Sequence, residues 1–315
     1  MKFDFNDINL VPRKRKVESR NDCDTSLVFG NRTFKMPIVP ANMECVINDD
    51  IAINLASNGY FYIMHRFGDT EKFVKMMNNR KLYTSISIGV GPESYSLLEN
   101  LYNQGRELDY VTIDIAHGHA TSMESMIKYL KSRFKNTFII AGNISTSEAV
   151  VDLENWGADA TKVGIGPGSA CTTYPATGFG SRNCQASVIH DCSISAKKPI
   201  IADGGIKEPG DISKSLVMGA SMVMIGGMLS GYSDSPGDAI NYNGKKYKEF
   251  WGSASKFQSN KSKRIEGKKI LIDYKEITLM EGIQYLEECL QSSISYAGGN
   301  NLSSFSDVKF ITHTK

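Results

Sequence analysis

The chain has 315 residues, of which 41% are hydrophobic and 22% charged, and its formal net charge is +2. This composition is typical of a globular protein with a sizeable core, and the near-neutral charge argues against nucleic acid as the main partner. No apolar run approaches the roughly 18 residues that span a membrane, and residues 1–6 do not resemble a signal peptide, so we expect a cytoplasmic protein without a membrane partner.

The six cysteines include no Cys-x-x-Cys pair and do not cluster with the five histidines, so neither a zinc site nor a disulfide framework is expected. Five of them are interpreted as reduced structural thiols: Cys23, Cys45, Cys184, Cys192 and Cys289. The sixth, Cys171, differs because it follows a glycine-rich loop.

Short apolar, β-rich segments recur along the chain, and stretches of helical length separate them. The predicted strands are residues 36–43, 60–64, 82–88, 110–115, 137–141, 160–165, 199–202 and 222–225. The predicted helices are residues 49–57, 70–77, 92–104, 121–134, 146–156, 186–194, 209–218 and 277–291. Alternation of strands and helices predicts an α/β protein with a parallel sheet, and the number of repeats favours a closed (β/α)8 TIM barrel over an open doubly wound sheet.

The alternation breaks after the eighth predicted strand. Residues 229–274 contain an Asn-Gly turn signal at 243–244 and a lysine-rich segment, and helical periodicity returns only near residue 277. We expect residues 1–315 to form a single barrel domain. In it, residues 229–274 are a lid-like hairpin excursion over the barrel mouth, between the eighth strand and the last helix.

Polar residues and glycines follow most of the predicted strands, and in a barrel these strand ends meet at one mouth. Asn42, His65, Asp114 and Asn143 are examples. After the last two strands come Asp203, Gly204, Gly205, Gly226 and Gly227, where glycine amides can hold a phosphate and the carboxylate suits a ribose diol. The alternative for Asp-Gly-Gly is an ordinary turn.

The most specific signal is the loop over residues 164–173, in which glycines precede Cys171 and several hydroxyls. Glycines allow backbone groups to approach a ligand closely, so the cysteine is placed to attack what the loop holds. The alternative is a small buried thiol. The carbonyls of Gly166 and Gly168 could also hold a monovalent cation such as K⁺.

This loop resembles the catalytic loop of the IMP dehydrogenase and GMP reductase family. Similarity extends over essentially the whole chain, including residues 5–12, 40–43, 202–206, 224–228 and 292–299. The chain has no room for the regulatory CBS insert or the Arg-Tyr flap of IMP dehydrogenases, and residues 265–268 resemble a Glu-Gly-Lys segment of GMP reductases. The resemblance therefore implies a homotetrameric enzyme that uses NADPH to convert GMP to IMP and ammonia. The alternatives are an IMP dehydrogenase without the insert and a non-catalytic purine-nucleotide sensor.

The resemblance also implies residue roles. Cys171 attacks the purine to form a thioimidate, and Thr173 and Glu266 relay the proton, unless Glu266 is merely a solvated loop charge. The implied substrate-binding residues are Ser169, Asp203, Gly204, Gly205, Gly226, Gly227, Gly252, Ser253 and Gly267. The implied cofactor-binding residues are Arg66, Asp114, Ala116, Ser292, Ser293 and Ser295. His117, Tyr174 and Lys263 depart from the family pattern, which weakens the nicotinamide contacts and the cation site.

Overall fold

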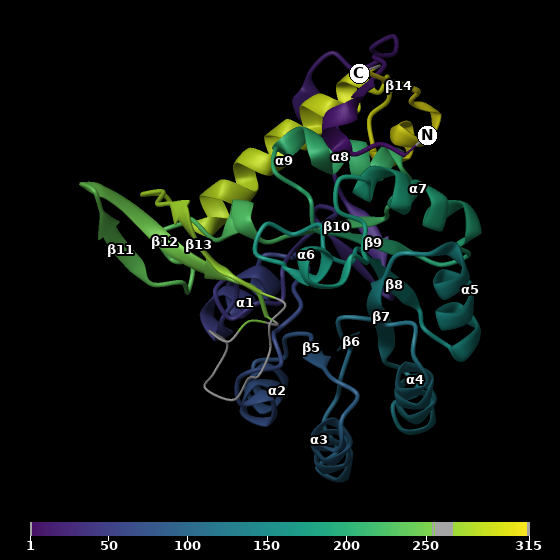
Figure 1. The fold of residues 1–315 in the computed structure, drawn as a ribbon, viewed down its shortest axis with the longest axis vertical. Coiled ribbons are helices and arrows are strands. Elements are labelled where there is room, and N and C mark those ends of the chain that lie inside the picture. Colours follow the sequence, from purple (N-terminus) through teal and green to yellow (C-terminus); the bar gives the residue numbers. More distant parts are fainter. Residues whose placement is uncertain (1, 254, 256–266, 314–315) are drawn as a thin grey trace.

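Parallel strands curl around a common axis in the computed structural model, which describes residues 2–253, 255 and 267–313 (Figure 1). Within these residues, seven strands hydrogen-bond in the order β4-β10-β9-β8-β7-β6-β5. Their bounds are β4 (Ile38–Pro40), β5 (Ser85–Ile88), β6 (Tyr110–Asp114), β7 (Phe138–Ile144), β8 (Ala160–Val163), β9 (Ile200–Asp203) and β10 (Met222–Ile225). Because β10 pairs with both β9 and β4, the last repeat returns to the first, as the predicted (β/α)8 barrel requires and an open doubly wound sheet does not.

The second predicted strand, residues 60–64, occupies the remaining place between β4 and β5 with little regular pairing. Met64 forms an isolated parallel bridge with Ile86 of β5. Tyrosine hydroxyls replace ladder hydrogen bonds here: the hydroxyl of Tyr83 donates to the carbonyl of Tyr60 at 2.6 Å, and that of Tyr62 accepts from the N–H of Ser85 at 3.1 Å. The prediction of a regular strand was therefore wrong in detail, although the segment lies where it was expected.

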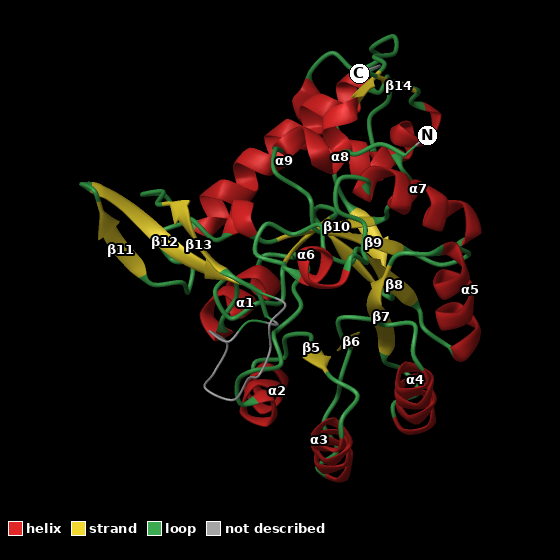
Figure 2. Ribbon diagram, in the orientation of Figure 1, coloured by secondary structure: helices red, strands yellow, loops and turns green. Residues whose placement is uncertain are grey.

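Helices surround the sheet on its outside (Figures 1 and 2). They are α1 (Asp49–Ser57), α2 (Thr70–Asn79), α3 (Pro92–Asn103), α4 (Thr121–Arg133), α5 (Ser147–Trp156), α7 (Gln185–Ser195), α8 (Pro209–Val217) and α9 (Leu279–Tyr296). Their starts follow from the sequence: Asn48 and Asp69 accept hydrogen bonds from helix N–H groups, and Thr278 forms a capping box with Glu281. None of the helices in the described part of the chain is long and apolar enough to cross a membrane.

Several short elements were not predicted. They are α6 (Thr173–Thr177), the antiparallel pairs β1 (Ile8–Leu10) with β14 (Phe310–Thr312) and β2 (Leu27–Phe29) with β3 (Arg32–Phe34), and the 3-10 turns η1 (Phe5–Asp7), η2 (Arg20–Asp22), η3 (Gly227–Leu229) and η4 (Leu302–Asp307). Each has at most six residues, which is too short for the hydrophobic periodicity that identifies longer elements.

Aromatic side chains close the barrel at the amino ends of its strands. Phe29 and Phe34, from the β2–β3 hairpin, pack edge-on against Phe61 with ring centroids 5.2 and 5.0 Å apart, and Phe61 packs against Tyr110 at 5.0 Å. All four rings are buried. Because this end is filled by rings, the opposite end is left for a site.

An antiparallel sheet forms within the predicted excursion, residues 229–274, and projects from one side of the barrel (Figure 2). Its strands are β11 (Ala239–Tyr242), β12 (Lys245–Trp251) and β13 (Lys269–Asp273). Asn243 and Gly244 have φ of 50° and 75°, as a two-residue hairpin turn of type I′ requires, so this turn is confirmed. The third strand, β13, was not predicted.

Candidate active site

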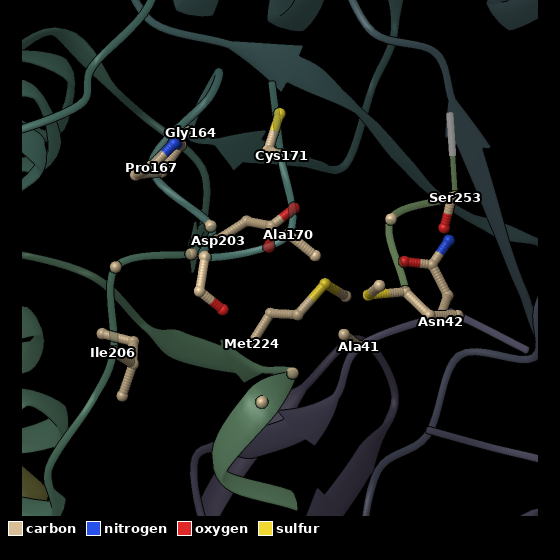
Figure 3. A pocket seen from close by; sticks show the side chains of 18 of the residues that line it. Ala41, Asn42, Gly164, Pro167, Ala170, Cys171, Asp203, Ile206, Met224 and Ser253 are labelled. Carbon is tan, nitrogen blue, oxygen red and sulfur yellow. The ribbon is translucent and has the colours of Figure 1, made fainter. Parts of the chain in front are cut away.

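A cavity of about 800 Å³ opens at the carboxyl ends of the barrel strands (Figure 3). It is bounded by the loops that follow β4, β6, β8, β9 and β10 and by residues of β12 and β13. The predicted site residues that line it are Arg66, Asp114, Ala116, Gly166, Gly168, Ser169, Cys171, Thr173, Asp203, Gly204, Gly205, Gly226, Gly227, Gly252 and Ser253. The fold therefore brings residues from distant parts of the chain to one place.

The cysteine loop begins directly after β8 with Gly164, whose φ is 148°. A Cβ at this glycine would lie 1.9 Å from the carbonyl oxygen of Asp203, so the end of β8 and the end of β9 approach closely only because position 164 is glycine. The loop then presents the partly exposed Cys171, whose Sγ donates to the Thr173 hydroxyl at 3.2 Å. This exposure excludes the alternative of a small buried thiol.

Residues of the excursion contact the backbone of the cysteine loop. Cys171 forms an antiparallel bridge with Gly267, and the N–H of Lys268 donates to the carbonyl of Ala170 at 2.9 Å. Gly252 lies in the same contact, because a Cβ there would be 2.9 Å from that carbonyl. Gly267 itself does not line the cavity in the described structure. The backbone of the excursion therefore holds the cysteine loop in place.

Glycines form the wall at the ends of β9 and β10. Gly204 and Gly205 have φ of 89° and 83°, a region that other residues rarely adopt. A Cβ on Gly227 would lie 3.6 Å from the hydroxyl oxygen of Ser169, so these two residues are neighbours in the lining of the cavity. Phe250 of β12 covers Gly226, since its ring would be 3.3 Å from a Cβ there. Sequence reasoning missed Phe250, because nothing in the strand pattern distinguishes it from a core residue.

Charged side chains form the opposite part of the site, and Lys162 of β8 lies at their centre. Its Nζ is 2.8 Å from Oδ1 of Asp114 and 2.8 Å from Oδ2 of Asp203, and its side chain is only 3% exposed. Asn143 donates to the same Oδ2 of Asp203 at 2.7 Å and to the carbonyl of Gly164 at 2.6 Å. Lys162 begins the predicted loop motif, but no role was assigned to it from sequence.

The environment of Asp114 keeps its carboxyl ionised. Burial alone would raise its pKa, but the positive charge and hydrogen bond of Lys162, the charge of Arg66 and a hydrogen bond from Asn42 together hold the pKa below its usual value. For Lys162, burial would lower the pKa, and the two carboxylates outweigh that effect and raise it. Asp114 and Lys162 therefore stay charged near neutral pH.

Arg66 follows the 60–64 segment and lines the cavity beside this charged group. Its Nε is buried without a hydrogen-bond partner within the described part of the chain, and its guanidinium lies 5.2 Å from the centroid of the Phe67 ring. A buried N–H without an acceptor is rare in folded proteins, and an anionic or carbonyl-bearing ligand would supply the acceptor.

His65 precedes Arg66 but does not line the main cavity; it lines a second cavity of about 390 Å³ that also contacts residues of α1 and α2. Its Nδ1 accepts from the N–H of Phe67 at 3.2 Å. Burial lowers the pKa of the imidazole to about 4, so the ring is neutral at physiological pH.

Some predicted residues are not brought to the cavity. Ser293 and Ser295 lie on the last turns of α9, where their hydroxyls donate to the carbonyls of Cys289 and Ser292, and none of the three predicted serines, Ser292 included, lines the cavity. His117 is exposed and also outside the lining, and Tyr174 is 40% exposed, with its ring beside Arg182. Glu266 and Lys263 lie outside the described residues.

The fold and this site define a (β/α)8-barrel protein with a partly exposed cysteine at its mouth, next to glycine-rich strand ends and a buried group of charges. A family model described as "IMP dehydrogenase / GMP reductase domain" matches residues 2–315, and the chain belongs to this family. It is 50% identical over 311 residues to the "GMP reductase" of Lactobacillus acidophilus, covering 98% of this chain and 94% of that protein. It is 52% identical over 311 residues to the "GMP reductase" of Albidiferax ferrireducens, covering 98% and 95%, respectively.

Proposed function

We propose that this chain is a GMP reductase, which converts GMP to IMP and ammonia with NADPH as reductant. The observation that carries the proposal is the partly exposed Cys171 on a cavity that also contains Asp203 and the glycine-rich ends of β9 and β10. This arrangement occurs in a chain about half identical to proteins named GMP reductase.

The glycine wall would bind the substrate. Gly204, Gly205, Gly226 and Gly227 leave their backbone amides accessible to a phosphate, and the hydroxyl of Ser169 faces them. Asp203, held by Lys162 and Asn143, presents an oriented carboxylate to the two ribose hydroxyls. Gly252, Ser253 and Gly267 would then lie toward the base, since Gly267 pairs with Cys171.

Cys171 would attack carbon 2 of the guanine, so that an S–C bond forms and the bond from carbon 2 to the exocyclic nitrogen breaks. The result is a thioimidate, and dividing one displacement into two steps lowers each barrier. Ammonia needs a proton to leave, and Thr173 is the closest placed hydroxyl, at 3.2 Å from the sulfur. Glu266 would complete this relay. Reduction of carbon 2 then releases Cys171 as the S–C bond breaks.

The charged part of the cavity would hold the cofactor. NADPH, when bound, supplies a hydride to carbon 2. The residues fit such a group, because Arg66 offers a buried N–H without an acceptor and Asp114 offers an ionised carboxylate for hydroxyl or amide donors. Ala116 lines the same part of the cavity. The cofactor-binding roles of Ser292, Ser293 and Ser295 stay predictions.

Four further proposals remain. The family resemblance implies a homotetramer, and the sequence pattern suggests a single domain, a lid formed by residues 229–274 and a monovalent cation at the carbonyls of Gly166 and Gly168. The Gly168 carbonyl already accepts from the N–H of Cys171 at 3.1 Å, so a cation there would share that oxygen. Ile272 and Asp273 of β13 line the cavity, which supports a covering role for the excursion.

The test is consumption of NADPH by the purified chain in the presence of GMP, with IMP and ammonia quantified as products. Equal amounts of IMP, ammonia and oxidised cofactor are expected. Xanthosine monophosphate and NADH formed from IMP and NAD⁺ would instead establish the IMP dehydrogenase alternative, and binding of GMP without turnover would establish the sensor.

The Glu266→Gln variant tests the proton relay separately. Because glutamine cannot carry the proton, reduction of GMP should slow by about 10²-fold or more. IMP with NADP⁺ involves no ammonia, so the first turnover in that direction should keep its near-normal NADPH burst in a stopped-flow measurement. Equal slowing in both directions, or in neither, would contradict a role in ammonia departure.

A further inference from the structure

Lys162 is a buried cation that takes no part in the proposed chemical steps. It contacts one carboxylate from each side of the cavity, at 2.8 Å in both cases. Asp114 and Asp203 are therefore no farther apart than twice this distance, although they end strands three places apart in the sheet. Two carboxylates this close, in a largely buried site, would repel each other without a cation between them.

The strand register explains how one side chain reaches both. Asp114 of β6 is opposite Gly142 of β7, and Gly142 is opposite Lys162 of β8. A Cβ on Gly142 would lie 2.6 Å from the Cβ of Lys162 and 2.7 Å from its carbonyl oxygen. The missing side chain at position 142 leaves the path along which Lys162 crosses β7 to Asp114.

We propose that Lys162 is a positioning residue that couples the nucleotide and cofactor sides of the cavity, by contacting and orienting one carboxylate of each side with a single ammonium group. The proposal rests on the proposed function, since it takes Asp203 as the ribose acceptor and Asp114 as an acceptor on the cofactor side. Donors on either ligand need an acceptor oxygen at a fixed position, and Lys162 fixes one for each ligand. Its loss should therefore weaken the binding of both ligands.

The test compares Lys162→Met with Lys162→Arg, which keeps the charge, and with Lys131→Met as a matched control. Lys131 also pairs with an aspartate, Asp159 at 2.6 Å, but on the outside of the barrel. Dissociation constants are measured by titration calorimetry for GMP alone and for NADP⁺ alone. We expect Lys162→Met to raise both constants at least tenfold, Lys162→Arg to raise them less than about threefold, and Lys131→Met to leave them unchanged.

A folded Lys162→Met variant that binds both ligands normally overturns the proposal. Weaker binding of only one ligand also overturns it, because the cation would then serve one side only. Failure of Lys162→Arg to restore binding would overturn it as well. If wild-type protein binds neither GMP nor NADP⁺, the proposed function fails, and that result is distinct from an unchanged variant of a wild-type protein that binds.

Thermal unfolding without ligand provides a second test, which applies if Lys162→Met is too unstable for binding measurements. The double variant Lys162→Met with Asp114→Asn removes one of the two carboxylates that would repel each other. We expect it to recover most of the melting temperature that Lys162→Met loses, while NADP⁺ binding stays weak. No recovery would show that the two carboxylates do not depend on a shared cation, which overturns the proposal.

Discussion

The two sides of the cavity are formed by different kinds of chemical group. At the ends of β8, β9 and β10 the wall is largely backbone, and its shape depends on glycines such as Gly164 and Gly204 at positive φ. At the end of β6 and after the 60–64 segment the wall is made of two charged side chains, Arg66 and Asp114, of which Asp114 pairs with Lys162. A substitution on the first side should therefore act by filling space or by straining the backbone. A substitution on the second side should act by changing the charge, with an effect that depends on pH.

The largest effect is expected at Cys171, the proposed nucleophile, which belongs to the backbone side. Cys171→Ala should lower the rate of GMP reduction by about 10³-fold or more, because the proposed covalent intermediate forms on its sulfur. GMP binding, measured by calorimetry, should stay within a few fold of wild type, since the proposed phosphate and ribose contacts lie elsewhere. Cys289→Ala on α9 is the matched control and should be fully active. A Cys171→Ala variant with substantial turnover would remove Cys171 from the chemistry.

Strain is tested at Gly164. Gly164→Ala places a Cβ 1.9 Å from the Asp203 carbonyl and forces alanine to adopt φ near 148°. The free energy of unfolding should fall by about 3–5 kcal/mol in chemical denaturation. Gly210→Ala is the control, because a Cβ there meets nothing within 4 Å, and its effect should stay below about 1 kcal/mol. Similar stabilities of the two variants would contradict a wall shaped by close backbone contact.

The Gly227→Val variant distinguishes a loss of space for the ligand from strain in the fold. A Cβ at Gly227 makes only ordinary contacts, 3.6 Å from Ser169 Oγ and 3.8 Å from Phe250, so the fold should tolerate the branched side chain. The side chain would occupy space proposed for the phosphate. The KM for GMP should therefore rise by about 10- to 100-fold, and the KM for NADPH should change little. Equal changes in both constants would place the phosphate elsewhere.

His65, which precedes Arg66 but lines the second cavity, should affect the pH dependence of stability. Burial holds the pKa of this imidazole at about 4 in the folded protein, below the roughly 6.5 of an unfolded chain. Protonation therefore favours unfolding, so stability is fully present above about pH 6.5 and is lost as the pH falls toward 4. The loss between pH 7 and pH 5 should be about 2 kcal/mol at most. His65→Asn should flatten the denaturation-derived profile in this window, and an unchanged slope would contradict the burial of His65.

The sequence was sufficient for most of the fold because its strands and helices carry strong periodic patterns. The predicted helix over 49–57 coincides with α1, and most other helices begin or end within two residues of prediction. The prediction was weakest where side-chain hydroxyls replace backbone pairing, at residues 60–64, and where strands are short or lack a clear alternation, as in β13. In such places tertiary contacts determine the structure, and local pattern cannot show them.

In the site, glycine signals were the most informative, because a glycine at a strand end has a simple physical reason. The role of Lys162 could not be predicted in this way: a lysine within a strand gives no sign of which carboxylates the barrel will place beside it. Phe250 was missed for the same reason, since its contact with Gly226 depends on how the excursion folds back. Roles for Ser292, Ser293 and Ser295 came from resemblance alone, and their side chains lie away from the described cavity.

Because β1 pairs with β14, the segments of the chain could be joined in a different order without changing the fold. Ile8 lies opposite Thr312 in an antiparallel pair, so the first and last strands are side by side at one end of the barrel (Figure 1). A short linker could therefore join the two ends, and the exposed turn at Gly105, where a Cβ would meet nothing within 4 Å, could supply new ones. A circular permutant built in this way would keep every strand neighbour while starting the chain at β6.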